Sequence, residues 1–158
     1  MIHAAQGEFP RIVLAPGTIE QCYTAGFRAL NLAEKYQTPV VILSDAFLAH
    51  SPRDLPLEAF DLDVPIERGD LLPKVQLDAL TEPYLRHAVT GSGISPRALP
   101  GHPRAVYPIT SDEHEPDGHI CEDAATRIQQ MDKRMHKLET ARAEMSAPIE
   151  YGPRDADF

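Results

Sequence analysis

Long hydrophobic runs are missing from this sequence of 158 residues. No apolar stretch approaches the roughly 18–20 residues that a membrane-spanning helix needs, and the first residues lack the apolar core of a signal peptide. Basic residues are outnumbered, with 15 Lys and Arg against 24 Asp and Glu, so the formal net charge is -9. Because an acidic surface repels phosphate groups and anionic lipid heads, we expect a cytoplasmic protein that binds neither nucleic acid nor membranes.

Cysteine is scarce as well. Cys22 and Cys121 are the only two cysteines, and they lie far apart in no paired motif. We interpret them as free thiols in a reducing compartment, with a single disulfide as the alternative. The sequence also has no glycine-rich phosphate loop, no nucleophile triad and no cysteine cluster. Iron–sulfur clusters are therefore not expected in this chain.

A metal site is not expected either. His114, His119 and Cys121 cluster, and His102 is a distant fourth candidate. Structural zinc sites use about four ligands, usually in paired spacings such as C-x2-C. We interpret these loop histidines as hydrogen-bonded structural groups or partner contacts.

The first fifty residues contain the clearest structural pattern. Residues 11–15 are a short apolar run closed by Pro16 and Gly17, which predicts a buried strand and a turn. Thr18 and Gln21 have capping-box spacing and predict a helix start, and Pro39 predicts that this helix ends after Tyr36. Residues 40–43 are continuously apolar, which is typical of a strand buried on both faces of a parallel sheet.

Strand, helix and strand together form one βαβ unit. Its helix is expected to pack through a stripe of small and apolar residues at helical spacing, which are Cys22, Gly26, Leu30 and Ala33. Ala25, Ala29 and Leu32 lie beside this stripe and widen it. Two strands are too few for a stable parallel sheet. We therefore expect the other strands in a different stretch of protein.

Proline dominates the middle of the chain. The sequence has 15 prolines, about twice the usual share of roughly 5 %, and no second βαβ pattern appears after residue 45. Apolar residues remain too frequent there for a solvated linker. Residues 123–145 predict a long helix, and its packing stripe is expected at Ile128, Met131, Met135 and Leu138.

These patterns divide the chain into three parts. We expect the second part of an α/β domain in residues 1–50, an extended interface arm in residues 51–118, and a long helix with a tail in residues 119–158. Asp45 follows the second strand, at the edge where ligands of α/β sheets bind; a cap on the next turn explains it equally well.

Several stretches, in collinear order over nearly the whole chain, resemble one family. They are Gly7-Glu8-Phe9-Pro10-Arg11-Ile12-Val13-Leu14-Ala15-Pro16-Gly17, Asn31-Leu32-Ala33-Glu34-Lys35-Tyr36, Pro39-Val40-Val41-Ile42-Leu43-Ser44-Asp45, Gly91-Ser92-Gly93-Ile94-Ser95-Pro96-Arg97-Ala98-Leu99-Pro100-Gly101, and Asp112-Glu113-His114 with Gly118-His119. Together they resemble the alpha subunits of 2-oxoacid:ferredoxin oxidoreductases, most closely the 2-oxoglutarate type.

The resemblance implies an α/β fold. The chain would be a partial thiamine-diphosphate-binding, pyrimidine-side parallel-sheet domain, with an extended proline-rich arm and a long C-terminal helix. Enzymes of the family convert a 2-oxoacid to an acyl-coenzyme A and pass electrons to ferredoxin. Their beta subunit is the expected partner, and thiamine diphosphate and magnesium are expected mainly on that subunit and on other segments.

The resemblance does not place a catalytic residue in this chain. The family's glutamate that polarises the aminopyrimidine, and its substrate motifs, belong to segments that this sequence does not contain. Residues 107–110, Tyr-Pro-Ile-Thr, repeat a short substrate motif in the wrong context, and we interpret them as a coincidence. The chain alone is therefore expected to be inactive.

The loop around Ser95 and Arg97 is the best candidate site, with His114 as a third residue. Glycines and prolines around it make a stiff loop, and the planar guanidinium of Arg97 suits a carboxylate. One hypothesis is that these residues line a subunit interface near the substrate; the alternative is an ion pair that holds the arm in place. The cofactor-binding residues stay unknown. Two other classes remain open, a non-catalytic module that binds a partner subunit and a truncated reading frame.

Overall fold

Residues 3, 7, 9–153 and 155 are described by the computed structural model. Glu8 of the first family-like stretch, and residues 154 and 156–158 of the predicted tail, lie outside them. Strand β1 (Ile12–Leu14) is followed by helix α1 (Ile19–Tyr36) and strand β2 (Val40–Ile42). The two strands pair in parallel, with Ile12 opposite Val40. The predicted βαβ unit is therefore confirmed.

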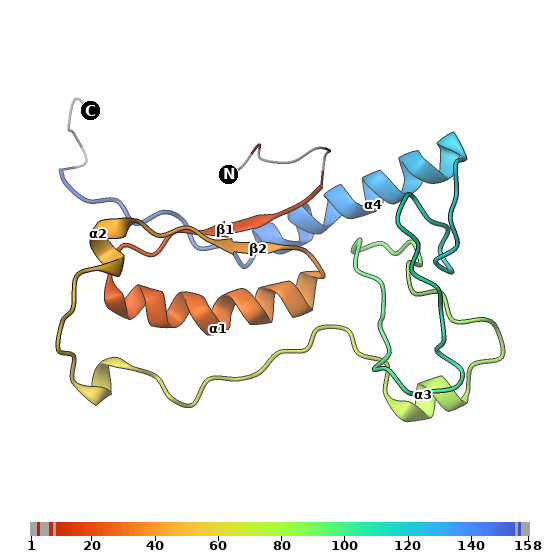
Figure 1. The fold of residues 1–158 in the computed structure, drawn as a ribbon, viewed down its shortest axis with the longest axis horizontal. Helices are drawn as coiled ribbons and strands as arrows, with labels where there is room; N and C mark the ends of the chain where they lie inside the picture. The colour runs from red at the N-terminus through yellow and green to blue at the C-terminus, as the bar shows by residue number, and fades with distance from the viewer. Residues whose placement is uncertain (1–2, 4–6, 8, 154, 156–158) are drawn as a thin grey trace.

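The remaining elements are short except for the last. They are α2 (Ala46–Ala49), the 3-10 turn η1 (Leu57–Ala59), α3 (Lys74–Asp78) and α4 (Ala124–Arg142). Figure 1 shows β1 and β2 above α1, with α4 rising to the upper right and a group of loops running from its upper end down to α3. None of the described helices is long and apolar enough to cross a membrane.

The start of α1 follows the predicted cap. The Thr18 hydroxyl accepts a hydrogen bond from the Gln21 amide at 3.2 Å. The Gln21 side chain accepts a hydrogen bond from the Gly17 amide at 2.7 Å. A standard capping box uses the amide of the cap residue itself, which is Thr18 here. At the other end, Gln37 adopts a left-handed conformation with φ 49°, which ends the helix before Pro39.

The predicted packing face of α1 is only partly correct. The buried residues are Ala25, Ala29, Leu32 and Tyr36. The first three were expected only at the edge of the packing face, and they form its centre. Leu30, which was expected at the centre, is 70 % exposed. The sheet is two strands wide and covers a narrow part of the helix, which leaves Leu30 uncovered.

The core lies where α4 reaches the sheet. Ile12, Leu32, Tyr36 and Ala141 form one buried cluster, and Met145 packs against it. The predicted stripe of α4 is only partly correct, because Ile128 and Met135 are exposed while Met131 and Leu138 are half-buried. The buried residues of α4 are instead Gln130, Lys133, Lys137 and Ala141.

Lysine 137 joins α4 to the end of α1. Its ammonium group donates to the carbonyl of Gln37 at 2.8 Å, where the negative end of the α1 dipole favours a cation. The Gln37 side chain donates in turn to the carbonyl of Ser95 at 2.6 Å. A further ion pair joins Lys35 to Glu144. These polar contacts explain how a helix with a polar buried face packs here.

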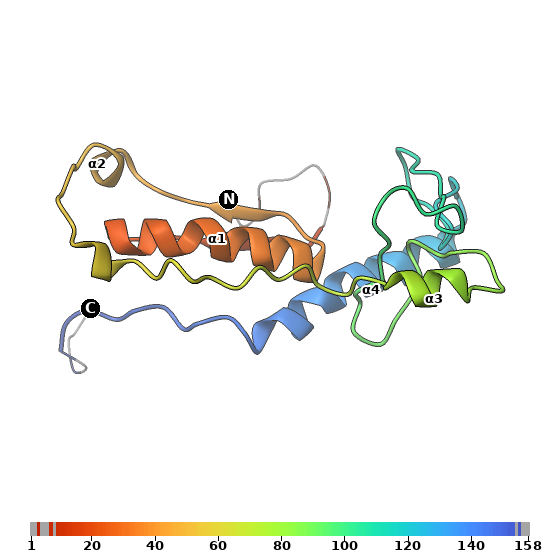
Figure 2. The same ribbon diagram turned by 90° about the horizontal axis from the view of Figure 1, so that it is seen from below.

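The chain between α2 and α3 runs along α1 as an extended segment without strands (Figure 2). Two glycines, one in this segment and one after α3, approach the helices closely. A Cβ at Gly69 would lie 2.7 Å from the carbonyl oxygen of Glu34 in α1. A Cβ at Gly93 would lie 2.6 Å from the carbonyl oxygen of Lys133 in α4.

Gly93→Ala is therefore expected to destabilise the contact of its loop with α4 by about 2 kcal/mol more than Gly101→Ala does. Both glycines have positive φ, 76° and 106°, but the space around Gly101 is open. Hydrogen exchange of the α4 amides measures the difference. Equal exchange rates in the two variants would show that packing at Gly93 is unimportant.

The molecular surface is large for the chain's size. The 17.5 kDa chain exposes 11414 Å², whereas a compact monomer of this mass exposes roughly 7,900 Å². Exposed large apolar side chains include Phe47, Leu57, Val75 and Val106. The excess area is comparable to the surface that obligate complexes bury, on the order of 2,000–5,000 Å².

Candidate functional site

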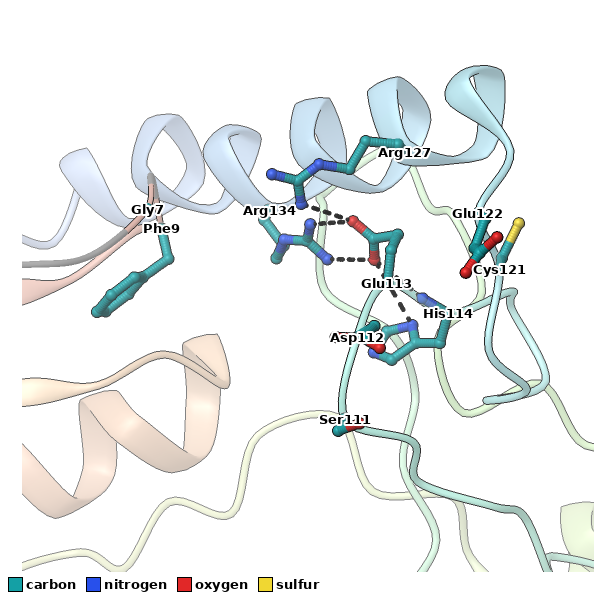
Figure 3. A pocket seen from close by; sticks show the side chains of 10 residues that line it. All are labelled: Gly7, Phe9, Ser111, Asp112, Glu113, His114, Cys121, Glu122, Arg127 and Arg134. Carbon is teal, nitrogen blue, oxygen red and sulfur yellow. Dashed lines mark hydrogen bonds and ion pairs between the residues drawn. The ribbon is translucent and has the colours of Figure 1, made fainter.

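Glu113 lies at the centre of a polar cluster between residues 107–121 and α4. Its carboxylate accepts two hydrogen bonds from the Arg134 guanidinium, at 2.9 and 2.5 Å. Arg127, about two turns earlier on the same face of α4, donates to the same carboxylate at 2.9 Å (Figure 3). The Glu113 side chain is 8 % exposed. Such bidentate contacts are among the stronger ion pairs in proteins, and they attach the loop to the helix.

Backbone contacts of the loop hold Glu113 in place. His114 and Ile120 form an isolated antiparallel bridge. The Cys121 amide donates to the carbonyl of Glu113 at 2.8 Å. Between them, a turn closes with a bond of 2.9 Å from the Gly118 amide to the Glu115 carbonyl. The turn chemistry of the sequence therefore positions the carboxylate.

His114 stacks on His87, with ring centroids 3.7 Å apart and planes at 22°. Burial, with the neighbouring His114 as the next cause, lowers the pKa of His87 to about 3. The ring is therefore neutral near pH 7. The His87 carbonyl accepts a hydrogen bond from the Lys133 ammonium group at 2.7 Å.

The two buried lysines of α4 are electrostatically unusual. Burial lowers the pKa of Lys133 to about 8, with Lys137 as the next cause. Burial likewise lowers the pKa of Lys137 to about 8, and Arg86 adds to this effect. Both ammonium groups donate to backbone carbonyls, which compensates part of the cost of burying them.

A pocket of about 640 Å³ opens beside this cluster. Its walls include Phe9, Ser111, Asp112, Cys121 and Glu122, besides the ion-paired groups (Figure 3). The Arg134 guanidinium holds the pKa of Glu113 down to about 2, so this carboxylate is ionised and is a poor general base. A second groove of about 750 Å³ lies along β1 and contacts α1, α4 and residues 145–149.

The predicted site residues fall into two places. The Ser95 hydroxyl donates to the Ala88 carbonyl at 2.8 Å, and Ser95 is 2 % exposed. Arg97 donates to the Glu34 carboxylate of α1 and to the Arg68 carbonyl at 2.7 Å. His114 belongs to the cluster on α4. The loop with Ser95 and Arg97 thus contacts α1, and His114 packs elsewhere.

Asp45 has the capping role that was one of its two interpretations. Its carboxylate accepts from the Leu48 amide at 2.9 Å, at the start of α2. Among the described residues, no group of three or more His, Cys, Asp or Glu side chains is placed to hold a metal ion.

Gln130, Lys133, Lys137 and His87 were not among the residues predicted from the sequence. The signal was present, because residues 130, 133, 137 and 141 recur at helical spacing. Lysine at such positions is normally taken as a solvated face. The carbonyl groups that accept their hydrogen bonds come from distant loops, which no local pattern shows.

The contacts of Glu113 and His87 predict an acid-sensitive loop. Glu113 has a folded-state pKa of about 2, below its usual 4.5, so its contribution is present above pH 4.5 and is lost as the pH falls towards 2. That contribution is about 3 kcal/mol. His87 remains neutral in the fold down to about pH 3, so stability already falls below pH 6.5, where an unfolded His gains a proton.

Hydrogen exchange of residues 107–121, measured from pH 7 to pH 3, checks this expectation. Correction for the intrinsic pH dependence of exchange is needed. In the Glu113→Gln variant, the loss of protection between pH 4.5 and 3 should become smaller, because only the His87 contribution is left there, while the loss between pH 6.5 and 4.5 should remain. An unchanged profile in this variant would contradict the assignment.

Comparison with known proteins gives a consistent picture. Residues 1–133 match the family model described as pyruvate flavodoxin/ferredoxin oxidoreductase, thiamine diphosphate-binding. The chain is 43 % identical over 145 residues to the alpha subunit of 2-oxoacid:ferredoxin oxidoreductase 1 from Sulfurisphaera tokodaii, which covers 91 % of this chain and 22 % of that one. It is 41 % identical over 46 residues to a 2-oxoglutarate synthase subunit from Methanothermobacter marburgensis, covering 29 % of this chain and 12 % of that one.

A solved structure agrees over a longer stretch. The 2-oxoglutarate:ferredoxin oxidoreductase from Magnetococcus marinus, with 2-oxoglutarate, coenzyme A and succinyl-CoA bound, matches with a TM-score of 0.75 and 31 % identity. The match covers 96 % of this chain and 25 % of that one. The chain thus spans between about a fifth and a quarter of the length of these longer relatives.

Proposed function

This chain belongs to the pyruvate flavodoxin/ferredoxin oxidoreductase family of thiamine-diphosphate-binding domains, and on that basis we propose that it is part of an alpha subunit of a 2-oxoacid:ferredoxin oxidoreductase. The proposed reaction is the oxidative decarboxylation of a 2-oxoacid, 2-oxoglutarate in the first place, to an acyl-coenzyme A. The electrons would pass to ferredoxin. The chain would act in the cytoplasm together with a beta subunit.

One observation carries this proposal. The Magnetococcus marinus 2-oxoglutarate:ferredoxin oxidoreductase shares the fold over nearly all of this chain, and not over the short βαβ unit alone. A βαβ unit is common to many unrelated functions. The agreement of the proline-rich segment and α4 is far more specific than agreement of a strand or a helix.

The exposed surface supports a role inside a larger assembly. Ile42 of β2 and the following Leu43 are more than 40 % exposed, although continuous apolar strands are normally covered on both faces. Within the part of the chain that the structure describes, each strand also pairs on one side only. We propose that other strands of the oxidoreductase cover these positions and complete the sheet. Thiamine diphosphate, when bound, supplies the carbanion chemistry of decarboxylation.

The described residues do not themselves fit the diphosphate or its magnesium ion. At the ends of the two strands, the Gly17 amide is bonded to Gln21 and the Asp45 carboxylate to the Leu48 amide. These polar groups are therefore used within the chain, and no described acidic cluster is placed to hold a metal ion. We propose that the beta subunit and other segments hold both groups, and that iron–sulfur clusters lie outside this chain.

Ser95, Arg97 and His114 have a structural role in this proposal. Arg97 joins the arm to α1 through Glu34 and Arg68, as the ion-pair hypothesis requires. Ser95 and His114 are turned to internal partners. The loop would shape the interface with the beta subunit without contacting the 2-oxoacid itself.

The experiment is a reconstitution. This chain, the remaining alpha segments and the beta subunit are produced together, and 2-oxoacid-dependent reduction of methyl viologen is measured with coenzyme A and thiamine diphosphate. Reduction is expected with the complete set and absent when this chain is omitted. Equal reduction without it, or tight association with no turnover, would contradict the proposal and favour a module that only binds a partner.

Comparing 2-oxoglutarate with pyruvate tests the substrate. The proposal expects a larger kcat/KM for 2-oxoglutarate. A larger kcat/KM for pyruvate would contradict the 2-oxoglutarate assignment and would leave the proposed class of reaction unchanged.

A further inference from the structure

Residues 61–67 lie beside α1 as an extended arm, hereafter the arm strand (Figure 2). Three contacts fix it to the helix. The Tyr23 hydroxyl donates to the Asp61 carbonyl at 2.7 Å. The Asn31 side chain donates to the Pro65 carbonyl at 2.9 Å and accepts from the Glu67 amide at 3.0 Å.

All three contacts use odd-numbered residues. In an extended backbone, the N–H and C=O groups of successive residues point to opposite edges. The odd edge of the arm strand therefore faces α1. On the other edge, the backbone groups of Leu62, Val64 and Ile66 make no hydrogen bond with any part of the chain that the structure describes.

Proline does not interrupt this free edge. Pro65 lacks an N–H, but its nitrogen belongs to the odd edge, where the helix lies. Proline in strands is tolerated at such positions. Leu62, Val64 and Ile66 therefore offer three successive pairs of donor and acceptor, which is the pattern that a further strand recognises.

The side chains of the arm strand alternate as well. The even positions carry apolar side chains: Leu62 is 66 % and Ile66 is 79 % exposed, and Val64 between them is half-buried. Asp61, Asp63 and Glu67 occupy odd positions. Among the described residues, Glu67 pairs with Lys35 at 3.4 Å, while Asp61 and Asp63 form no ion pair.

We propose that the arm strand receives a β-strand from a companion polypeptide of the oxidoreductase, in which apolar residues alternate with Lys or Arg. Cross-strand neighbours lie on the same face, so apolar residues would pack on Leu62 and Ile66, and basic residues would lie opposite Asp61 and Asp63. A second copy of this chain does not suit the edge, because its own arm strand would bring like charges together.

The choice of a companion polypeptide rests on the proposed function. Two findings support it here: the chain spans about a quarter or less of its longer relatives, and its surface exceeds that of a compact monomer. The edge geometry itself is independent of the reaction.

A proline pair tests the backbone contact. In the assembled oxidoreductase, Val64→Pro removes an amide from the free edge, and Asp63→Pro removes an amide on the other edge that donates to the Asp61 carboxylate at 3.1 Å. Val64→Ala and Asp63→Ala control for loss of the side chains. We expect Val64→Pro to weaken co-purification of the companion at least about tenfold relative to Val64→Ala, because a buried backbone acceptor would lose its donor. Asp63→Pro should stay within about twofold of Asp63→Ala.

Residue-resolved hydrogen exchange and a charge change complete the test. Assembly should slow exchange at the Leu62, Val64 and Ile66 amides at least about tenfold. The double variant Asp61→Lys, Asp63→Lys should weaken association, and so should higher salt. Unchanged exchange at the even positions, equal effects of the two prolines, self-association through the arm, or indifference to the charge reversal would each overturn the inference.

Failure of this inference is separable from failure of the proposed function. An active complex in which the amides of the arm strand exchange freely would refute the strand contact and leave the proposed function intact. A complex in which the arm strand is protected from exchange, but which shows no 2-oxoacid-dependent reduction, would refute the proposed function and keep the strand contact.

Discussion

Replacing Arg134 by alanine is expected to lower, by about 3 kcal/mol, the free energy that is needed to open the contact between residues 107–121 and α4. The variant loses two of the three guanidinium hydrogen bonds of Glu113. The carboxylate remains in a site where its side chain is 8 % exposed, and a buried charge without its partner is costly. Hydrogen exchange of the loop amides, in the assembled protein, measures the change.

Arg127→Ala is the matched control. Arg127 donates to the same carboxylate, but its side chain is 54 % exposed, and exposed ion pairs contribute at most about 1 kcal/mol. A double variant, Arg134→Ala with Glu113→Gln, should recover part of the loss, because the unpaired charge is gone. Equal effects of the two arginine changes would contradict the central role of the Arg134 pair.

Leu32→Ala is expected to destabilise the packing of α4 on the βαβ unit by about 3 kcal/mol. Leu32 is buried with Ile12, Tyr36 and Ala141 in a cluster that joins α1, β1 and α4. Truncation leaves a cavity that the short strands close only in part. The expected signature is faster exchange of the amides around Ala141 as well as those of α1.

Leu30→Ala provides the comparison within the same helix. Leu30 is exposed in this chain. Its truncation should therefore change the opening free energy of α4, as hydrogen exchange measures it, by less than about 0.5 kcal/mol. A large effect of Leu30→Ala on α4 would show that the helix packs through the face that the sequence first suggested.

Local chemistry explains the part of the fold that the sequence predicted. Thr18 caps α1, Pro39 limits its far end, and the continuous apolar residues 40–43 contain β2. Each of these signals acts within a few residues. The same is true of Asp123, whose side chain accepts from the Thr126 amide at 2.8 Å and begins α4.

Contacts between distant segments explain what the sequence did not show. The apolar residues Ile128 and Met135 are exposed, and the polar residues Gln130 and Lys133 are buried. Their partner is the carbonyl of His87, more than forty residues away. Amphipathicity assumes that a helix packs on apolar surface, and this assumption fails where loops present backbone carbonyls.

The candidate site follows the same division. The stiffness of the loop around Arg97 was predictable from its glycines and prolines, whereas the choice of Glu34 and Arg68 as partners depends on how the arm crosses α1. His114 was singled out for its place in a motif, but its stacking partner His87 was not.

Equilibrium unfolding of the isolated 158-residue chain in urea, followed by far-UV circular dichroism, tests the central claim most directly. The claim is that this chain is completed by other parts of an oxidoreductase, because its two strands and large surface lack cover. We expect a broad, weakly cooperative transition that becomes sharp only when the companion segments are present. A sharp two-state transition of the chain alone, with the slope that a 158-residue globular domain shows, would contradict it.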